Sequence, residues 1–272
     1  QKYSLQDLFA KIQLADDERL FAVAEALRRG VSVEQLHRLT GMDLFFLDGF
    51  QFIVNLENTL AKQKEWSRED WLMAKKTGFS DYQLAYLTGK TEEEVRKIRQ
   101  ELGIQAGYRM VDTCAGEFAA TTPYYYSSYG EEDELEPSDR EKVIVLGSGP
   151  IRIGQGIEFD YCSVHSAWSI RESGREAIVI NNNPETVSTD PDTSDRLFFE
   201  PLTLENVLNV VEAEKPLGVV VQFGGQTAIN LAKPLADCGV KILGTSVADI
   251  DRAEDREKFD ALLEELGIPR PE

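Results

Sequence analysis

Apolar residues are spaced differently in the two halves of this sequence. Up to residue 103 they recur every three or four positions, which is the spacing along one side of an amphipathic helix. From residue 142 onward they gather in short, mostly β-branched runs that alternate with longer segments of helical spacing. The pattern predicts an all-helical N-terminal part followed by alternating strands and helices.

Capping residues and glycines mark the ends of the helices in the first half. Ser67 precedes Asp70 by three positions and Thr91 precedes Glu94 by three, which is the spacing of a capping box. Glycines stand where several of the apolar stripes stop, and glycine commonly ends a helix. The predicted helices cover 5–12, 16–30, 32–41, 44–56, 67–78, 80–89 and 91–103.

Residues 44–56 are apolar on every side of the predicted helix. Nine of the thirteen side chains in LFFLDGFQFIVNL are large and apolar. A helix of this kind must be buried within its own domain or against a partner. We therefore expect the helical half to self-associate, with Phe46 and Phe50 in a core or an interface.

A short repeat occurs within the helical half. SVEQLHRLTG at 32–41 aligns with SDYQLAYLTG at 80–89, and each copy is followed by a second helix. A helix-turn-helix invites a DNA-binding interpretation, which needs basic and amide side chains on the second helix. The second helix is too apolar in one copy and opens with three glutamates in the other. The sequence thus favours helical packing over DNA recognition.

Composition and charge limit which partners the protein can bind and in which cellular compartment it is expected. The 272 residues include 29 basic and 48 acidic side chains, a net charge of -19, which disfavours binding to nucleic acid. No apolar run approaches the length of a membrane helix, and the N-terminus lacks a signal pattern. Three widely spaced cysteines suit a reducing cytoplasm. The chain does not begin with Met, so we expect a fragment of a longer protein.

The charge changes sharply near the middle of the chain. Residues 1–127 hold 16 basic and 19 acidic side chains (net -3), whereas residues 128–272 hold 13 and 29 (net -16). The stretch TTPYYYSSYGEEDELEP at 121–137 has few aliphatic residues and an acidic run. We interpret it as a connector whose tyrosines lie on a neighbouring surface, and a plain flexible linker is the alternative.

The second half predicts a parallel, doubly wound sheet of the Rossmann-like kind. Strand and helix patterns alternate at the spacing of βαβ units, and ligand sites in such sheets lie at the carboxyl ends of the strands. The predicted strands cover 142–146, 177–180, 196–199, 217–222 and 240–243, and the predicted helices lie near 156–173, 203–214, 226–238 and 254–266.

Three polar loops follow strands of this sheet, so they should converge on its carboxyl edge. GSGPIRIGQG at 147–156 is neither a dinucleotide fingerprint nor a P-loop, because position 152 is Arg and no Gly-Lys-Ser/Thr follows. It places Arg152, Gln155 and Glu158 close together. NNNPETVSTD at 181–190 and QFGGQT at 222–227 are the other two loops. A merely structural role as βα turns is the alternative for each.

The sequence offers no pair of nucleophile and base, and no metal-ligand cluster. His165 follows Cys162 by three positions on a predicted helix, and we interpret both as packed side chains rather than catalytic ones. We therefore predict no catalytic residue, no metal ligand and no cofactor-binding residue within this chain.

Six segments carry a resemblance to a known family. In order along the chain they resemble carbamoyl-phosphate synthase, large subunit: VDTCAGEF, GSGPIRIGQGIEFDY, NNNPETVSTD, TSDRLFFEPLT, VVQFGGQTAINLA and GTSVADIDRAEDREKF. The resemblance implies a helical oligomerisation domain with its connector over 1–139, the connector being about 104–139. It implies a Rossmann-like pre-ATP-grasp subdomain over 140–272. Fold class is then α followed by α/β.

The resemblance also implies an activity for the whole protein. The family makes carbamoyl phosphate from bicarbonate, glutamine-derived ammonia and two ATP, for arginine and pyrimidine biosynthesis. Each ATP binds with Mg²⁺ or Mn²⁺ in an ATP-grasp module, and a glutaminase small subunit supplies ammonia. The chain stops where the second module should begin, so we expect no ATP or metal to bind this fragment and no activity from it alone.

The loops match residues that line the family's passage for carbamate. The matching positions are Arg152, Gly154, Gln155, Gly156, Glu158 and Glu185. Carbamate is short-lived in water, so it needs a secluded route, and glycines leave such a route unobstructed. Ser148 departs from the Gly of many relatives and leaves this assignment intact. For the loop, the alternative is that Arg152 and Glu158 form an ordinary ion pair that braces it. For the whole chain, the alternative is a free-standing protein that binds a small anion or nucleotide at this loop.

Overall fold

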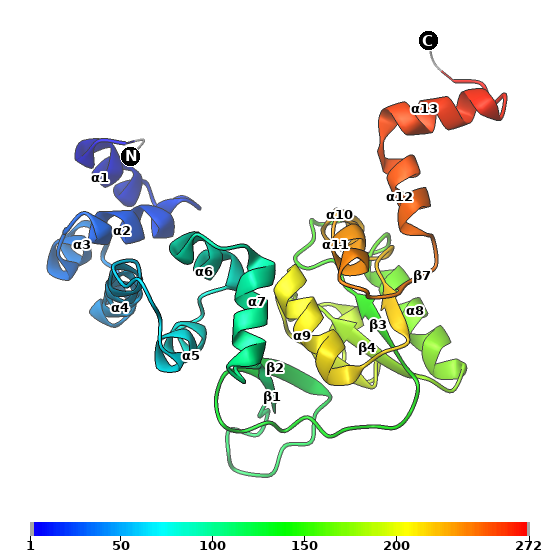
Figure 1. Ribbon diagram of the computed structural model, residues 1–272, viewed down its shortest axis with the longest axis horizontal. Coiled ribbons are helices and arrows are strands. Elements are labelled where there is room, and N and C mark those ends of the chain that lie inside the picture. Colours follow the sequence, from blue (N-terminus) through cyan, green and yellow to red (C-terminus); the bar gives the residue numbers. More distant parts are fainter. Residues whose placement is uncertain (1–2, 271–272) are drawn as a thin grey trace. The chain divides into compact units, whose positions relative to one another are not determined.

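The computed structural model describes residues 3–270, and the chain divides into two compact units at Ile104. Figure 1 shows helices in the first unit, in blue to cyan, and a sheet with helices in the second, in green to red. This confirms the predicted fold class of a helical part followed by an α/β part. Within residues 3–270, no helix is long and apolar enough to cross a membrane.

Within residues 3–104 the structure has seven helices, and the sequence pattern predicts each of them. Capping boxes are present at Ser4, Ser67, Ser80 and Thr91. Gly41 and Gly89 adopt left-handed conformations after the two repeated segments. The helices are α1 (Leu5–Leu14), α2 (Arg19–Arg28), α3 (Val33–Thr40), α4 (Leu44–Leu60), α5 (Arg68–Lys76), α6 (Asp81–Thr88) and α7 (Glu92–Glu101).

Both copies of the repeat serve packing. The first copy contributes Leu36 and the helix after it contributes Leu47 and Val54 to one apolar cluster with α1 and α2. The second copy buries Leu84, and α7 buries Val95. The helices after the two copies thus lie against their own unit, as the packing interpretation expects.

A buried ionic cluster joins three helices of this unit. The Asp81 carboxylate accepts hydrogen bonds from Arg99 Nε at 2.7 Å and from Lys75 Nζ at 3.2 Å. All three side chains are almost fully buried. The same two cations also donate to the backbone oxygens of Ile104 and Phe79, so the cluster fixes the ends of α5 and α7.

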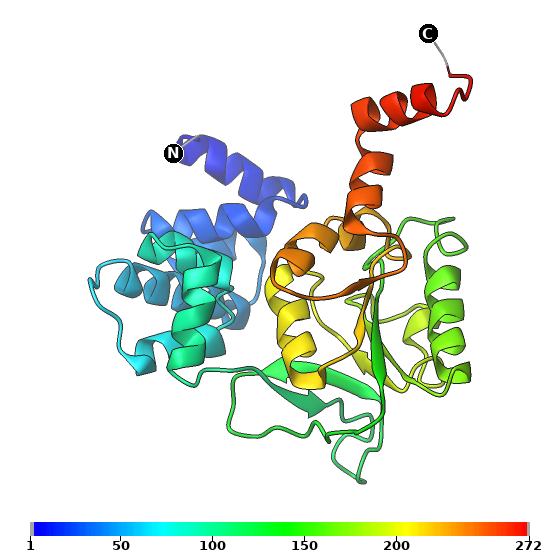
Figure 2. The ribbon, with the colours of Figure 1, turned by 45° about the vertical axis from the view of Figure 1, so that its right-hand side comes forward.

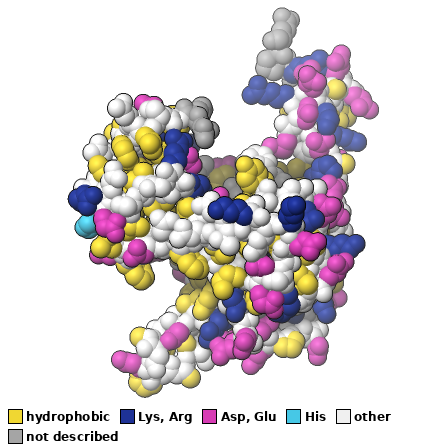
Figure 3. Space-filling view, turned by 60° about the vertical axis from the view of Figure 1, so that its left-hand side comes forward, with side chains coloured by type: hydrophobic (Ala, Val, Ile, Leu, Met, Phe, Trp, Pro, Cys, Tyr) yellow, Lys and Arg dark blue, Asp and Glu magenta, His cyan; other side chains and the backbone are white. Residues whose placement is uncertain are grey.

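Helix α4 leaves much of its apolar surface exposed in the single chain. Its fully buried side chains are Leu47, Val54 and Leu60. Phe50 packs against the core, whereas Phe45 is 77% exposed and Phe46 is 60% exposed. Figure 3 shows apolar side chains, in yellow, at the molecular surface. Of the two residues expected in a core or interface, Phe50 contacts the core and Phe46 does not.

In the described part of the second unit, residues 105–270, the strands form a seven-stranded sheet in the order β1-β2-β5-β4-β3-β6-β7. Only β1 and β2 pair antiparallel; the remaining neighbours are parallel. The strands are β1 (Gly107–Met110), β2 (Tyr124–Ser128), β3 (Lys142–Leu146), β4 (Glu176–Ile180), β5 (Arg196–Phe198), β6 (Gly218–Val220) and β7 (Ile242–Leu243). The helices are α8 (Asp160–Glu172), the 3-10 turn η1 (Val187–Thr189), α9 (Leu204–Glu214), α10 (Gly225–Ile229), α11 (Ala232–Asp237), α12 (Val247–Glu254) and α13 (Arg256–Glu265).

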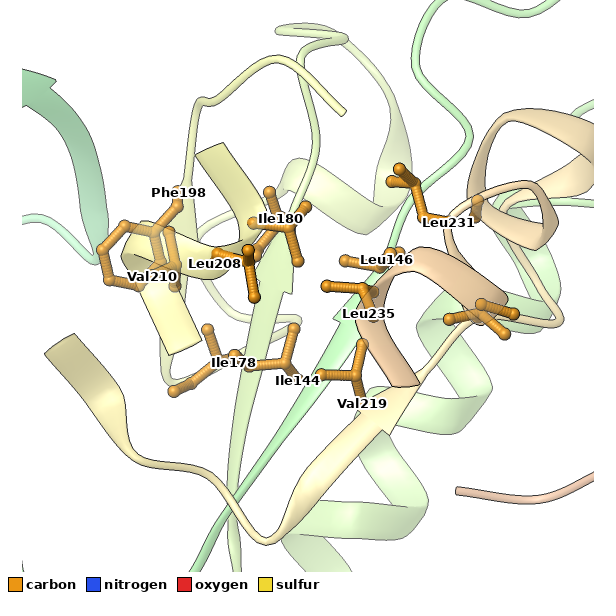
Figure 4. Packing of buried hydrophobic residues seen from close by; sticks show 14 of the residues in the cluster. Ile144, Leu146, Ile178, Ile180, Phe198, Leu208, Val210, Val219, Leu231 and Leu235 are labelled. Carbon is orange, nitrogen blue, oxygen red and sulfur yellow. The ribbon is translucent and has the colours of Figure 1, made fainter. Parts of the chain in front are cut away.

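Apolar side chains cover both faces of the central strands. Ile144 and Ile178 point toward α9 and α11, and Figure 4 shows them among the buried side chains of that face. Val145 and Val179 point the other way, toward α8. Figure 2 shows α9 and α11, in yellow and orange, on one side of the strands and α8, in light green, on the other. The unit is therefore doubly wound, with its core split between two faces.

The segment expected to be a connector contributes to the sheet. Strand β2 pairs in parallel with β5, and the Tyr125 ring is buried and stacks on Phe198 with centroids 5.6 Å apart. A plain flexible linker is therefore wrong for residues 124–128. The tyrosines do lie on a neighbouring surface, but as part of a strand that the sequence pattern did not predict.

Candidate functional site

Three loops meet at the carboxyl edge of the sheet, after the neighbouring strands β4, β3 and β6. A Cβ at Gly147 would lie 2.5 Å from Asn181 Nδ2, and a Cβ at Gly224 would lie 2.3 Å from the Gly147 carbonyl oxygen. Real Cβ atoms do not approach so closely, so only glycine permits these contacts. The loops predicted to converge therefore touch one another directly.

Two buried side chains connect the first two loops by accepting hydrogen bonds from the backbone. Asn181 is fully buried, and its Oδ1 accepts hydrogen bonds from the backbone N–H of Gly149 at 3.0 Å and of Asn183 at 3.1 Å. The buried Asp160 carboxylate accepts the backbone N–H of Ser188 at 3.1 Å. The sequence pattern predicts that these two loops meet, but it does not indicate that Asn181 and Asp160 connect them.

The first loop presents most of the predicted passage residues to solvent. Arg152 and Glu158 are exposed, and Gln155 is half-buried. Gln155 fixes a turn, because its Oε1 accepts the backbone N–H of Arg152 at 3.0 Å. Among residues 3–270, Arg152 and Glu158 form no ion pair, so the alternative of a bracing salt bridge is not supported.

The glycines of this loop have different constraints. Gly154 has a φ of +94°, which disfavours any side chain, although nothing lies within 4 Å of an added Cβ. Gly156 has an ordinary backbone conformation, and its added Cβ also meets nothing within 4 Å. The first atom of a side chain at Gly156 would therefore meet no neighbour within this unit.

Glu185 lies in the second loop and is also exposed. Its backbone N–H donates to Asn183 Oδ1 at 3.2 Å, so the backbone at Glu185 is fixed close to the Asn181 contacts. The structure thus places Arg152, Glu158 and Glu185 on two loops that touch at one sheet edge. Whether these side chains guide a substrate stays a prediction.

Two other titratable side chains near the sheet, Glu200 and His165, contact residues of their own unit. Burial raises the pKa of Glu200, although the Ser127 backbone N–H and the Asn206 amide both donate to its carboxylate. This carboxylate joins β2 to α9. On α8, His165 is exposed rather than packed as expected, and its ring contacts Tyr161 and Trp168, with centroids 4.1 Å and 5.2 Å away. In the part of the chain that the structure describes, no group of three metal-ligating side chains gathers.

An apolar groove of about 730 Å³ lies between α8 and strands β6 and β7. Tyr161, His165 and Phe223 are among the side chains that line it, and none of the six predicted passage residues does. The groove and the loop pair are therefore separate features of this unit.

Two family models match this chain, one in each unit. The model of the carbamoyl-phosphate synthetase large chain, oligomerisation domain, matches residues 1–103. The model of the carbamoyl phosphate synthase preATP-grasp domain matches residues 139–252, which include β3 to β7 and the three loops. Both models describe parts of one large chain, and together they cover most of this sequence. The chain belongs to the carbamoyl-phosphate synthase large-chain family.

Proposed function

We propose that this chain forms part of the large subunit of a glutamine-dependent carbamoyl-phosphate synthase. Such an enzyme joins bicarbonate and ammonia to phosphate from ATP, and a glutaminase subunit releases the ammonia. The observation that carries the proposal is the presence of the oligomerisation and pre-ATP-grasp domains, in that order, on one chain. The helical unit would provide assembly, and the α/β unit would provide one wall of the carbamate passage.

The chemistry of the loop pair suits transit better than bond making. Arg152 carries a permanent positive charge that can attract the carbamate anion, and Glu158 and Glu185 can accept hydrogen bonds from its amino group. The three side chains are exposed rather than desolvated, whereas catalytic groups are usually found in shielded sites. We infer that other domains of the enzyme complete the passage and shield it from water.

The residues of this unit do not fit ATP. A nucleotide on a Rossmann-like sheet would place phosphates at the start of the helix after the first strand. In this unit the buried Asp160 carboxylate occupies the start of α8 and would repel them. The close contact of Gly147 with Asn181 also fills the space beside the strand end. We propose that ATP, with Mg²⁺ or Mn²⁺, binds in ATP-grasp modules outside residues 1–272.

A binding experiment separates this proposal from a free-standing nucleotide-binding protein. The 272-residue chain alone should show no micromolar affinity for ATP by titration calorimetry, and it should form no carbamoyl phosphate from ATP, bicarbonate and ammonia. A large chain that contains these domains together with ATP-grasp modules should form it. Micromolar binding of ATP to the 272-residue chain would instead support the free-standing nucleotide-binding function.

We further propose that the exposed face of α4 forms a contact between copies of the chain. Phe45→Asp and Phe46→Asp should each weaken self-association by about tenfold or more, because each would bury a charge in an apolar interface. Phe118→Asp is the matched control, since Phe118 is 76% exposed in the other unit. Sedimentation velocity over a concentration series measures the effect. Equal association of all three variants and the unmodified chain would exclude α4 from the interface.

A further inference from the structure

We propose that Asn181 is a positioning residue for the passage. Its buried amide holds the loop after β3 against the loop after β4, and so sets where Arg152 and Glu158 lie relative to Glu185. The consequence for transit rests on the proposed function, whereas the contact between the loops can be measured without it.

The Asn181 side chain is placed where it can act on both loops. Its Oδ1 accepts one hydrogen bond from Gly149, 32 positions earlier in the chain, and another from Asn183 in its own loop. The contact is close, because the backbone at Gly147 leaves no room for even a Cβ beside the amide. Two backbone N–H groups therefore depend on one buried oxygen, and an apolar side chain at this position would leave both without it.

A second contact fixes the other end of the first loop. Asp160 follows that loop directly, and both of its carboxylate oxygens accept the Ser188 backbone N–H, at 3.1 and 3.2 Å. The Asn181 Nδ2 donates to the Ser188 hydroxyl at 3.4 Å, so the two contacts belong to one buried network. The exposed turn that carries Arg152, Gly156 and Glu158 lies between these two fixed points.

The neighbouring residue provides a matched comparison. Asn182 has the same side chain but is exposed, and within residues 3–270 its amide makes no hydrogen bond. Asn181→Leu removes the acceptor at nearly constant size. Asn181→Asp keeps an oxygen that can accept from both N–H groups, but it loses the donor to Ser188 and places a second carboxylate near Asp160. Asn182→Ala tests whether any change at this loop has the same effect.

The experiment uses the proposed large chain that carries these domains and has two readouts. Hydrogen exchange followed by mass spectrometry reports the amides of peptides that cover 147–152 and 181–185. The ratio of ATP hydrolysed to carbamoyl phosphate formed reports transit. Asn181→Leu should speed exchange by about tenfold or more and raise the ratio at least about twofold. Asn181→Asp should recover only part of what Asn181→Leu loses, because it buries a charge close to Asp160, and Asn182→Ala should change neither the exchange nor the ratio.

Each failure has a distinct meaning. Unchanged exchange in Asn181→Leu would show that the contact does not hold the loops. Faster exchange with a normal ratio would show that Asn181 is merely structural. If Asn181→Leu does not accumulate as folded protein, Asn181→Ala takes its place with the same readouts. Gly156→Leu, measured in parallel, tests the passage itself, so a normal ratio in that variant would reject the proposed function rather than the role of Asn181.

Discussion

Asp81→Ala is expected to lower the free energy of unfolding of the helical unit by about 3–5 kcal/mol, because it removes one carboxylate from two buried cations. Arg99 approaches this carboxylate with two nitrogens and Lys75 with one, and the three side chains are at most 3% exposed. Water cannot replace the lost partner at such depth. A loss of this size is a large fraction of the stability of a small domain.

Glu101→Ala is the matched control for this variant. Glu101 lies on α7, the helix that carries Arg99, but it is exposed and forms no ion pair within residues 3–270. Its removal should change stability by less than about 0.5 kcal/mol. Urea unfolding of the 272-residue chain, followed by far-UV circular dichroism, measures both variants. Similar midpoints for the two would show that the ionic cluster does not stabilise the unit.

The helices of the first unit could be predicted because their ends are encoded locally. Ser67 and Thr91 accept hydrogen bonds from residues only three positions away. The ionic cluster could not be predicted in the same way. Asp81 and Arg99 are 18 positions apart, and nothing in the local pattern says that both are buried.

Strands β1 and β2 could not be predicted, because their sequence lacks the usual aliphatic pattern. Strand β2 consists of tyrosines and serines, and it lies between β1 and β5. It is held by backbone pairing and by the packing of Tyr125 on Phe198. Those partners are distant in the sequence, so composition alone indicated a connector.

Several helices of the second unit begin or end at other residues than the sequence pattern predicts, for local reasons. The helix expected from residue 156 begins at Asp160, after the turn that contains Gly154. The helix expected over 226–238 is divided into α10 and α11, because Pro234 has no N–H to continue the ladder and is tolerated only in a first turn. Helix α12 was not predicted, although Ser246 caps it.

The candidate site could be predicted only in part. Strand order placed the three loops at one edge, and the resemblance identified the residues on them. The role of Asn181 was not foreseen, because it depends on a backbone N–H 32 positions away rather than on a motif. Side-chain exposure at Arg152, Glu158 and Glu185 likewise required the structure.

Gly156→Leu should uncouple ATP hydrolysis from product formation in the proposed large chain. The Cβ of the added side chain does not clash with the unit itself, since nothing lies within 4 Å of it. It would instead occupy the space beside the loop through which carbamate is proposed to travel. Output of carbamoyl phosphate should fall by about tenfold or more, because blocked carbamate decomposes in water, while bicarbonate-dependent ATP hydrolysis continues.

Glu158→Gln distinguishes transit from catalysis at the same loop. The amide keeps the shape of the carboxylate and removes its charge, so a passage should tolerate it better than added bulk. We expect it to retain at least about a third of the output. A loss as severe as that of Gly156→Leu would indicate that Glu158 takes part in bond chemistry.

The ratio of ATP hydrolysed to carbamoyl phosphate formed by Gly156→Leu tests the central claim most directly. The passage account predicts a ratio several times that of the unmodified protein, with folding unchanged by circular dichroism and ATP hydrolysis largely retained. A Gly156→Leu protein with the normal ratio and the normal rate of carbamoyl phosphate formation would contradict it.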